Sequence, residues 1–281
     1  MNFREELHVV PGAPVDLAGR DPSAKPGVPG DKAKTKTALD EMGEELASLQ
    51  DRLYAEGTVE GNTRRILLVL QGMDTSGKGG VIKHVAGQVD PLGLEIASFK
   101  KPTKEELSHD FLWRIRKRIP AHGHIGIFDR SHYEDVLIVR VRELVERSIW
   151  EPRYDEINEF ERELTEDGVT LIKCFLHITY DTQRERLLAR LDDPAKRWKF
   201  NEGDIDERRR WDDYQAAYQD ALRRCSTEHA PWYVVPSDAK WARNWVVGNL
   251  LLETLREMDP QYPDRPDLDD ADLKAKLAPP N

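Results

Sequence analysis

The chain has 281 residues, a formal net charge of −10 and two cysteines, so it is long enough for a sizeable α/β domain and needs no disulfide framework. The acidic balance excludes a protein that coats nucleic acid with a general basic surface, because counterion release requires clustered Lys and Arg. No apolar run could span a bilayer and no signal-peptide pattern opens the chain, so we expect a soluble protein that does not bind a membrane. The two cysteines lack metal-ligand spacing, and their small number suits a reducing cytoplasm. We therefore expect a cytoplasmic protein that does not bind nucleic acid.

The chain changes character at about residue 38. Residues 11 to 37 are rich in Pro, Gly and Lys and contain few apolar residues, which predicts that residues 1–37 form an extended arm and not a packed element. From Ala38 to Glu56 apolar residues recur at helical spacing, which predicts an amphipathic helix at the start of the main domain.

The central region alternates between buried strands and helices. The continuous apolar run at 65–71 ends in a glycine loop, which predicts a strand buried on both faces and a following helix through Val89. Further strands are expected near 95–99, 124–129, 169–178 and 232–236, and further helices near 104–118, 133–147, 155–166, 182–191, 204–224 and 240–257. This alternation predicts an α/β fold with a parallel sheet covered by helices on both faces, in one domain over 38–258, while the Pro- and Asp-rich residues 259–281 predict a peripheral tail.

Residues 72 to 80, GMDTSGKGG, have the pattern of a phosphate-binding loop except at one position. Backbone N–H groups of such a loop and of the helix after it converge on phosphate oxygens, and the lysine adds a mobile positive charge. The usual Ser or Thr after the lysine, whose hydroxyl binds Mg²⁺, is replaced by glycine. The predicted phosphate-binding residues here are Gly72, Thr75, Ser76, Gly77, Lys78, Gly79, Gly80 and Lys83; the alternative is an ordinary glycine-rich turn.

Two carboxylates replace the missing hydroxyl in our interpretation. Asp74 within the loop would repel a phosphate unless a cation lay between them, so it is the predicted Mg²⁺ ligand, with Thr75 or Ser76 as lesser candidates. Asp129 ends a buried strand at the edge where open α/β folds bind ligands, and Mg²⁺ sites commonly use one or two carboxylates; a helix cap is the alternative for Asp129. The next residue, Arg130, suits bidentate binding of a phosphoryl group. Mg²⁺ is the expected cofactor, and Mn²⁺ could substitute for it.

A basic segment follows the fourth predicted strand. Its side chains suit a lid, placed at about 192–210, that closes over phosphates and excludes water; the basic residues we select are Arg190, Lys196, Arg197 and Lys199. Neighbouring acidic residues offset most of this charge, so a solvated pair of charged helices is the alternative. Ser131 and His132 are adjacent in sequence and lack an oriented carboxylate partner, which disfavours acyl transfer and leaves phosphoryl transfer by positioning and electrostatics.

Three ordered motifs, GMDTSGKGG, FDRSHYEDV and DDPAKRWKFNEGDIDERRRWDDYQAAY, resemble those of polyphosphate kinase family 2, and the resemblance covers about Ile66 to Trp245. It implies a P-loop kinase fold like that of thymidylate kinase, with a helical lid, and Mg²⁺-dependent transfer of the terminal phosphoryl group of inorganic polyphosphate to a nucleotide. It also implies a homo-oligomer, a dimer or a tetramer. Carried over by motif, Asp74 and Asp129 would bind metal and anchor the acceptor, Lys78 and Arg130 would bind phosphate, and the lid residues, above all Arg190 and Lys199 with Asp206 in addition, would meet polyphosphate or nucleotide.

Glu134, in HYEDV, bears on the acceptor. Family members restricted to nucleoside diphosphates resemble DRSWYNR here, whereas Glu134 is similar to the subgroup that also accepts monophosphates. We therefore expect AMP and ADP as acceptors, with ADP and ATP as products of a reversible reaction; the alternative for Glu134 is a helix-dipole contact. The competing functions are an ATP-dependent nucleoside monophosphate kinase and a nucleotide-binding module without catalysis.

Overall fold

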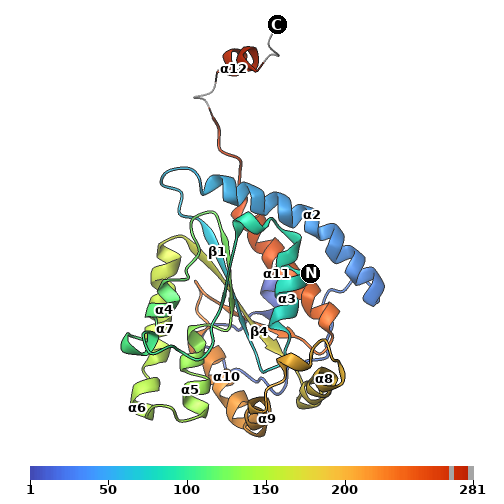
Figure 1. Ribbon diagram of the computed structural model, residues 1–281, viewed down its shortest axis with the longest axis vertical. Coiled ribbons are helices and arrows are strands. Elements are labelled where there is room, and N and C mark those ends of the chain that lie inside the picture. The colour runs from blue at the N-terminus through green and yellow to red at the C-terminus, as the bar shows by residue number, and fades with distance from the viewer. Residues whose placement is uncertain (266–268, 278–281) are drawn as a thin grey trace.

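In the computed structural model, which describes residues 1–265 and 269–277, five strands form one parallel sheet (Figure 1). They are β1 (Arg65–Gln71), β2 (Leu94–Ser98), β3 (Ile125–Asp129), β4 (Val169–His177) and β5 (Trp232–Pro236). Their spatial order is β2-β3-β1-β4-β5, so β1 is central. Because Leu70 of β1 is in register with Asp129 of β3, the loop after β1 and the loop after β3 begin at the same edge of the sheet.

The α-helices of the described residues lie on both faces of this sheet, except the last one in the chain, which lies apart from it (Figure 1). They are α1 (Phe3–Leu7), α2 (Lys32–Glu56), α3 (Lys78–His84), α4 (Trp113–Arg116), α5 (Ile138–Val141), α6 (Arg147–Trp150), α7 (Arg153–Glu166), α8 (Tyr180–Asp192), α9 (Gly203–Arg209), α10 (Trp211–Cys225), α11 (Lys240–Met258) and α12 (Asp270–Lys276). Short 3-10 helices occur at Ala86–Gln88, Pro91–Gly93, Glu106–Ser108, His132–Asp135 and Arg197–Lys199.

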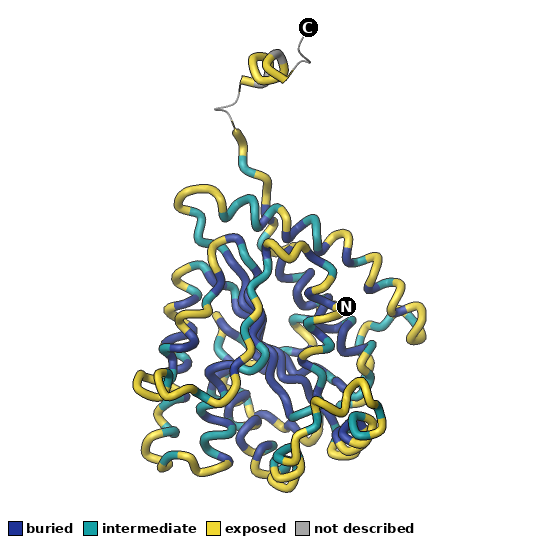
Figure 2. Tube along the Cα trace, viewed as in Figure 1, coloured by how far each residue is buried: buried dark blue, intermediate teal, exposed yellow. Residues whose placement is uncertain are grey.

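The two faces carry separate apolar cores because strand side chains alternate in direction. Leu67 and Val69 of β1 pack with α7 and α10, whereas Ile66 and Leu68 pack with α1, α2, α3 and α11. Every residue of β1 is buried, as Figure 2 shows for the centre of the molecule. The predicted all-parallel sheet, and the predicted strand at 65–71, are confirmed.

Three of the predicted helices are interrupted in the structure. Over 104–118 the chain forms only a 3-10 turn and the four-residue α4. Thr103 and Glu106 bond each other's backbone N–H groups and so cap the first turn. Asp110, however, accepts from the N–H of Leu112, and a side-chain bond of this kind competes with a continuous helix.

The other two broken helices flank the candidate site. The predicted helix at 133–147 is a 3-10 turn followed by α5, which ends before Glu143 with φ of 50°. The predicted helix at 204–224 is divided into α9 and α10 at Arg210, whose guanidinium donates to the carbonyl of Val141. The helix after the glycine loop also ends early, at His84 instead of Val89.

The N-terminal arm is packed, which the composition did not predict. Val9, Val15 and Leu17 are buried in the core that contains α7 and α10. The helix predicted from Ala38 begins at Lys32, because Asp31 caps it by accepting from the N–H of Lys34. At the other end, α12 lies within the predicted tail 259–281, while 266–268 and 278–281 fall outside the described residues.

Candidate active site

The glycine loop between β1 and α3 has an unusual backbone. Gly72, Thr75 and Gly77 have φ of 154°, 65° and 110°, conformations that are costly for most L-residues. A Cβ at Gly77 would lie 1.7 Å from Nη1 of Arg243, so only glycine fits there. Gly79, which replaces the usual hydroxyl residue, has nothing within 4 Å of its would-be Cβ, so a side chain there is not excluded by lack of space.

Lys78 is the first residue of α3, and its side chain extends back to the start of the loop. Its side chain is buried, and its Nζ donates to the carbonyl of Gly72 at 2.9 Å. Burial and the nearby Arg130 lower the pKa of Lys78, while Asp129 and Asp74 act in the opposite direction. The lysine therefore lies among the predicted carboxylates.

Asp74 and Arg130 join the two loops. Nη2 of Arg130 lies 3.0 Å from Oδ1 of Asp74, and Arg130 has φ of 65° while its N–H donates to the carbonyl of Leu70. Burial disfavours the charged guanidinium, but Glu134 and Asp74 outweigh burial and raise the pKa of Arg130. The strained backbone after Asp129 thus aims Arg130 at the phosphate loop.

Glu134 lies on the same side and is positioned by β1. With the Gln71 amide oriented to satisfy both of its ends, its nitrogen donates to Oε1 of Glu134 at 3.0 Å and its oxygen accepts from the N–H and hydroxyl of Ser131. Burial raises the pKa of Glu134, although Arg130 and Lys78 oppose this. The structure therefore brings together all five predicted catalytic residues, which are Asp74, Lys78, Asp129, Arg130 and Glu134.

Two further side chains reach this cluster. The buried phenol of Tyr218, on α10, lies against the backbone of Gly72, and burial and the Glu134 carboxylate raise its pKa. Asp204, on α9, accepts from Arg190 at 3.5 Å, and burial and the charge of Asp74 raise its pKa. Neither was selected from the sequence, since an aromatic residue on an amphipathic helix and an acidic residue in a charged run are both typical of ordinary surfaces and cores.

The donor groups fit a Mg²⁺ ion. The hydroxyls of Thr75 and Ser76 are buried and have no protein partner, and Asp74 and Asp129 both act on Lys78. Among the described residues no group of three or more His, Cys, Asp or Glu side chains could hold a metal by itself. This suits Mg²⁺, which retains waters and binds through one or two carboxylates together with substrate phosphates.

The predicted basic residues are only partly gathered at the site. Arg190 is half-buried beside Asp204, whereas Lys196 is exposed and pairs with Asp193. Four more of the predicted residues are exposed to solvent: Lys83, Arg197, Lys199 and Asp206. Lys83 is in the last turn of α3, Lys199 lies over the exposed ring of Trp198, and Asp206 pairs with Arg209.

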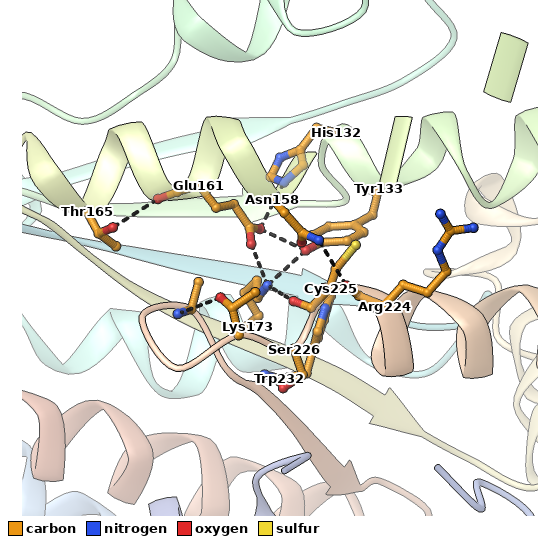
Figure 3. A network of polar contacts seen from close by, with 12 residues as sticks. His132, Tyr133, Asn158, Glu161, Thr165, Lys173, Arg224, Cys225, Ser226 and Trp232 are labelled. Carbon is orange, nitrogen blue, oxygen red and sulfur yellow. Dashed lines mark hydrogen bonds and ion pairs between the residues drawn. The ribbon is translucent and has the colours of Figure 1, made fainter. Parts of the chain in front are cut away.

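A buried polar network supports the loop after β3 from behind (Figure 3). Oε1 of Glu161 accepts from the phenol of Tyr133 at 2.8 Å and lies 3.1 Å from Nε2 of His132. Nζ of Lys173 donates to Glu161, to Tyr133 and to the carbonyl of Cys225. All four side chains are fully buried, so the segment His132–Asp135, which includes Glu134, is attached to α7 and β4.

The same network accounts for His132. Its imidazole faces Glu161, while the Ser131 hydroxyl bonds Gln71 and the N–H of Tyr133. Serine and histidine are therefore not a nucleophile and base pair, as the sequence indicated. Burial alone would raise the pKa of Glu161, but Lys173 and His132 reverse this and hold it below its ordinary value.

A cavity of about 810 Å³ adjoins the loop at Gly80. It is bordered by Gly80 and lined by residues of α2, α8 and α11, including the basic side chains Lys32, Lys36, His84, Arg186, Lys240 and Arg243. Burial and the charges of Arg186 and Arg243 lower the pKa of Lys240. The cavity thus has a positive potential next to the phosphate loop.

Three side chains that hold this geometry were not selected from the sequence. Gln71 had a signal, because it is the polar last residue of an apolar strand. The sequence also contains a signal for Arg243, because it is a charged residue in a mostly apolar helix, where the structure buries it. Arg186 had none, because α8 is charged throughout.

None of the helices formed by the described residues combines the length and apolar character needed to cross a membrane.

A family model described as "Polyphosphate kinase 2 (PPK2)" matches residues 30–263. The chain is 47% identical over 259 residues to an AMP/ADP-polyphosphate phosphotransferase of Meiothermus ruber, covering 92% of this chain and 95% of that protein.

Two further comparisons agree. The chain is 42% identical over 233 residues to an ADP-polyphosphate phosphotransferase of Rhodopseudomonas palustris, covering 79% of each. Its structure is similar to the crystal structure of polyphosphate kinase 2 from Arthrobacter aurescens TC1, with a TM-score of 0.93, 49% identity and coverage of 99% and 96% of the two chains. The predicted P-loop kinase-like fold is therefore confirmed.

Proposed function

The chain belongs to the polyphosphate kinase 2 family, and we propose that it transfers the terminal phosphoryl group of inorganic polyphosphate to AMP and ADP, forming ADP and ATP reversibly. The observation that supports this most directly is the cluster around the Asp74–Arg130 ion pair, with Lys78 and Glu134 beside it. Such a cluster offers charge and orientation but no covalent nucleophile, as phosphoryl transfer requires.

In the forward reaction an oxygen of the acceptor's terminal phosphate attacks the terminal phosphorus of polyphosphate. The anhydride bond to the next phosphate breaks, and the shortened polyphosphate keeps the bonding electrons. Lys78 and the loop N–H groups hold the donor, while Arg130, at the boundary between the loops, meets the transferring group. Glu134 lies on the acceptor side, where its carboxylate can interact with a short acceptor such as AMP.

Mg²⁺ is the proposed cofactor, with Mn²⁺ as a substitute, and when bound it would neutralise phosphate charge. Asp74 and Asp129 would hold it, and the partnerless hydroxyls of Thr75 and Ser76 would bind its waters or the phosphates. With its carboxylate engaged by the metal, Asp74 would no longer pair with Arg130, and the guanidinium would be available for phosphate.

The basic cavity supports a polyanionic donor. It adjoins Gly80 of the loop and has room for several phosphates beyond the one that reacts. Arg190 and Asp204 connect α8 and α9 beside Asp74. We assign the segment 192–210 as a lid that excludes water, since water would otherwise accept the phosphoryl group, and we assign a homo-oligomer, dimer or tetramer, as the working assembly.

The test is an assay without ATP. Purified protein, Mg²⁺ and long-chain polyphosphate are incubated with AMP or with ADP, and the nucleotides are separated by chromatography. ADP and ATP formed from AMP would support both acceptors, while ATP from ADP alone would remove AMP. Product formed only after an ATP donor is added would indicate an ATP-dependent nucleoside monophosphate kinase instead, and no product under either condition would indicate a binding module.

A further inference from the structure

Two buried arginines lie directly beneath the phosphate loop. Arg186, on α8, is 9% exposed, and its Nη1 donates to the carbonyls of Thr75 and Ser76 at 2.8 and 3.2 Å. Its Nη2 donates to the carbonyls of Ser237 and Asp238, in the loop after β5. One guanidinium therefore joins the phosphate loop to the opposite edge of the basic cavity.

Arg243, on α11, approaches the same loop from the other side. It is 2% exposed, and its Nη1 donates to the carbonyl of Ser76 at 3.1 Å. Its Nε and Nη2 donate to the amide oxygen of Asn244. The guanidinium fills the space that side chains at Gly77 and Gly80 would need, which is why the loop has glycine there.

The charges of these two residues are only partly balanced within the protein: Asp238 and Glu185 oppose the burial that lowers the pKa of Arg186, and no carboxylate does so for Arg243 among the groups that shift its pKa. In the part of the chain that the structure describes, neither guanidinium forms an ion pair with a carboxylate, although most other buried arginines and lysines do. Their partners are carbonyls and an amide, which accept hydrogen bonds but carry no net charge. Burial and the neighbouring Arg186 accordingly lower the pKa of Arg243. Burying an uncompensated charge is costly.

We propose that Arg186 and Arg243 form an arginine floor: two positioning residues that turn the loop carbonyls of Thr75 and Ser76 away from the ligand and supply positive charge that a bound phosphate chain balances. With these carbonyls held below, the loop N–H groups are free to point at the donor phosphates. The floor rests on the proposed function, because it assigns polyphosphate as the balancing anion. It makes loop geometry and donor affinity depend on charges that do not touch the reacting atoms.

The experiment compares neutral and charged replacements. Arg186→Gln and Arg243→Gln retain a donor for the loop carbonyls but remove the charge, while Arg186→Lys and Arg243→Lys retain the charge. Arg65→Gln is the matched control, because Arg65 is 4% exposed, donates to the carbonyl of Thr63 and lies at the opposite end of β1, but pairs with Asp167. Each protein is melted with and without long-chain polyphosphate and Mg²⁺, and KM is measured separately for polyphosphate and for ADP.

Each Gln variant is expected to raise the KM for polyphosphate about tenfold, the order of one hydrogen bond to a charged group, while the KM for ADP changes less than about twofold. The gain in melting temperature caused by polyphosphate should shrink, because stabilisation by a ligand falls as its affinity falls. The melting temperature without ligand should fall less than in Arg65→Gln, since an unbalanced charge has been removed. Both Lys variants should recover most of the polyphosphate affinity.

Other results would overturn the floor. Gln and Lys variants that behave alike would show that charge is not the cause, and equal increases in both KM values would indicate general disorder of the site. If polyphosphate stabilises the wild type and the Gln variants equally, the floor fails while the proposed function stands. If polyphosphate neither stabilises the wild type nor serves as donor, both fail. Should one Gln variant not fold, its partner at the other arginine decides the question.

Discussion

The phosphate loop and the segment across from it, His132–Asp135, are supported in different ways. The loop rests on the arginine floor, whose hydrogen bonds go to backbone carbonyls and whose charge has no carboxylate partner. The segment with Glu134 rests on Lys173, Glu161, His132 and Tyr133, a buried network in which opposite charges meet. The support of the donor side thus has positive charge that an anion can balance, whereas in the support of the acceptor side the buried charges balance one another.

This difference has an energetic consequence. A balanced buried network loses much of its stability when one partner is removed, because the other charge is left alone. Removing a buried cation that has no carboxylate partner lowers the stability of the protein less, because the cost of desolvating that charge is removed with it. Substitutions behind the acceptor side should therefore act mainly on folding, and those beneath the donor side mainly on ligand affinity.

The largest effect is expected for Lys173→Met, which leaves the buried Glu161 carboxylate without its cation. We expect a loss of about 3–5 kcal/mol in the free energy of unfolding, typical of a broken buried pair, measured by urea denaturation at pH 7. Lys83→Met, on the exposed part of α3, should change it by less than about 0.5 kcal/mol. A small loss at Lys173 would mean that the two sides are supported alike.

The pH dependence of that loss has a definite sign. In the wild type the pKa of folded Glu161 lies below its usual value of 4.5, so its stabilisation is present above that value and is lost as pH falls through the lowered pKa. In Lys173→Met the isolated buried carboxyl takes a raised pKa. The difference in stability between the two proteins should therefore begin to shrink above pH 4.5, as the raised pKa of the variant is reached, and should go on shrinking until the pH passes the lowered pKa of wild-type Glu161. A constant difference would contradict the charge explanation.

Asp74→Asn is expected to have the next largest effect and to act on catalysis. Loss of the proposed metal-binding carboxylate should lower kcat by at least about a hundredfold, the order seen when a key electrostatic group is removed, with little change in melting temperature. Asp272→Asn is the control, because Asp272 is exposed and pairs with Lys276 on α12. Near-normal turnover by Asp74→Asn would exclude Asp74 as the principal metal ligand.

Glu134→Gln should separate the two acceptors. We expect kcat/KM for AMP to fall about tenfold relative to ADP, which is about 1.4 kcal/mol, because the carboxylate on the acceptor side is lost. Since the pKa of Glu134 is raised above 4.5, the ratio of kcat/KM for AMP to kcat/KM for ADP should decline in the wild type as pH falls through that raised pKa. Glu134→Gln should abolish this pH dependence. Equal losses on both acceptors would remove Glu134 from acceptor choice.

The smallest effect is expected for Gln71→Leu. It removes the hydrogen bond to Glu134 and the acceptor for Ser131, each worth about 1 kcal/mol. The ratio of AMP to ADP use should change about threefold in the same direction as for Glu134→Gln, by about 0.6 kcal/mol, and the combined variant should add nothing further to that ratio. Additive effects would show that Gln71 does not act through Glu134.

By itself, the sequence determined the features that depend on short runs of residues. The apolar run at 65–71 requires a strand buried on both faces, and the glycines after it require a loop with positive φ. The carboxylates at the ends of β1 and β3 meet because parallel neighbours place their C-terminal ends at one edge. These features are decided within a few residues or by a general rule of sheet geometry.

Only the tertiary structure decided which distant side chains complete the site. Arg186 and Arg243 lie more than a hundred residues after the loop that they support, and Tyr218 reaches Gly72 from α10. The predicted helix over 104–118 failed because particular side chains bond the backbone, and the arm is packed because Val9, Val15 and Leu17 find a core built from later elements. A local pattern states what a segment can bury or bond, but its partner is selected by the packing of the whole chain.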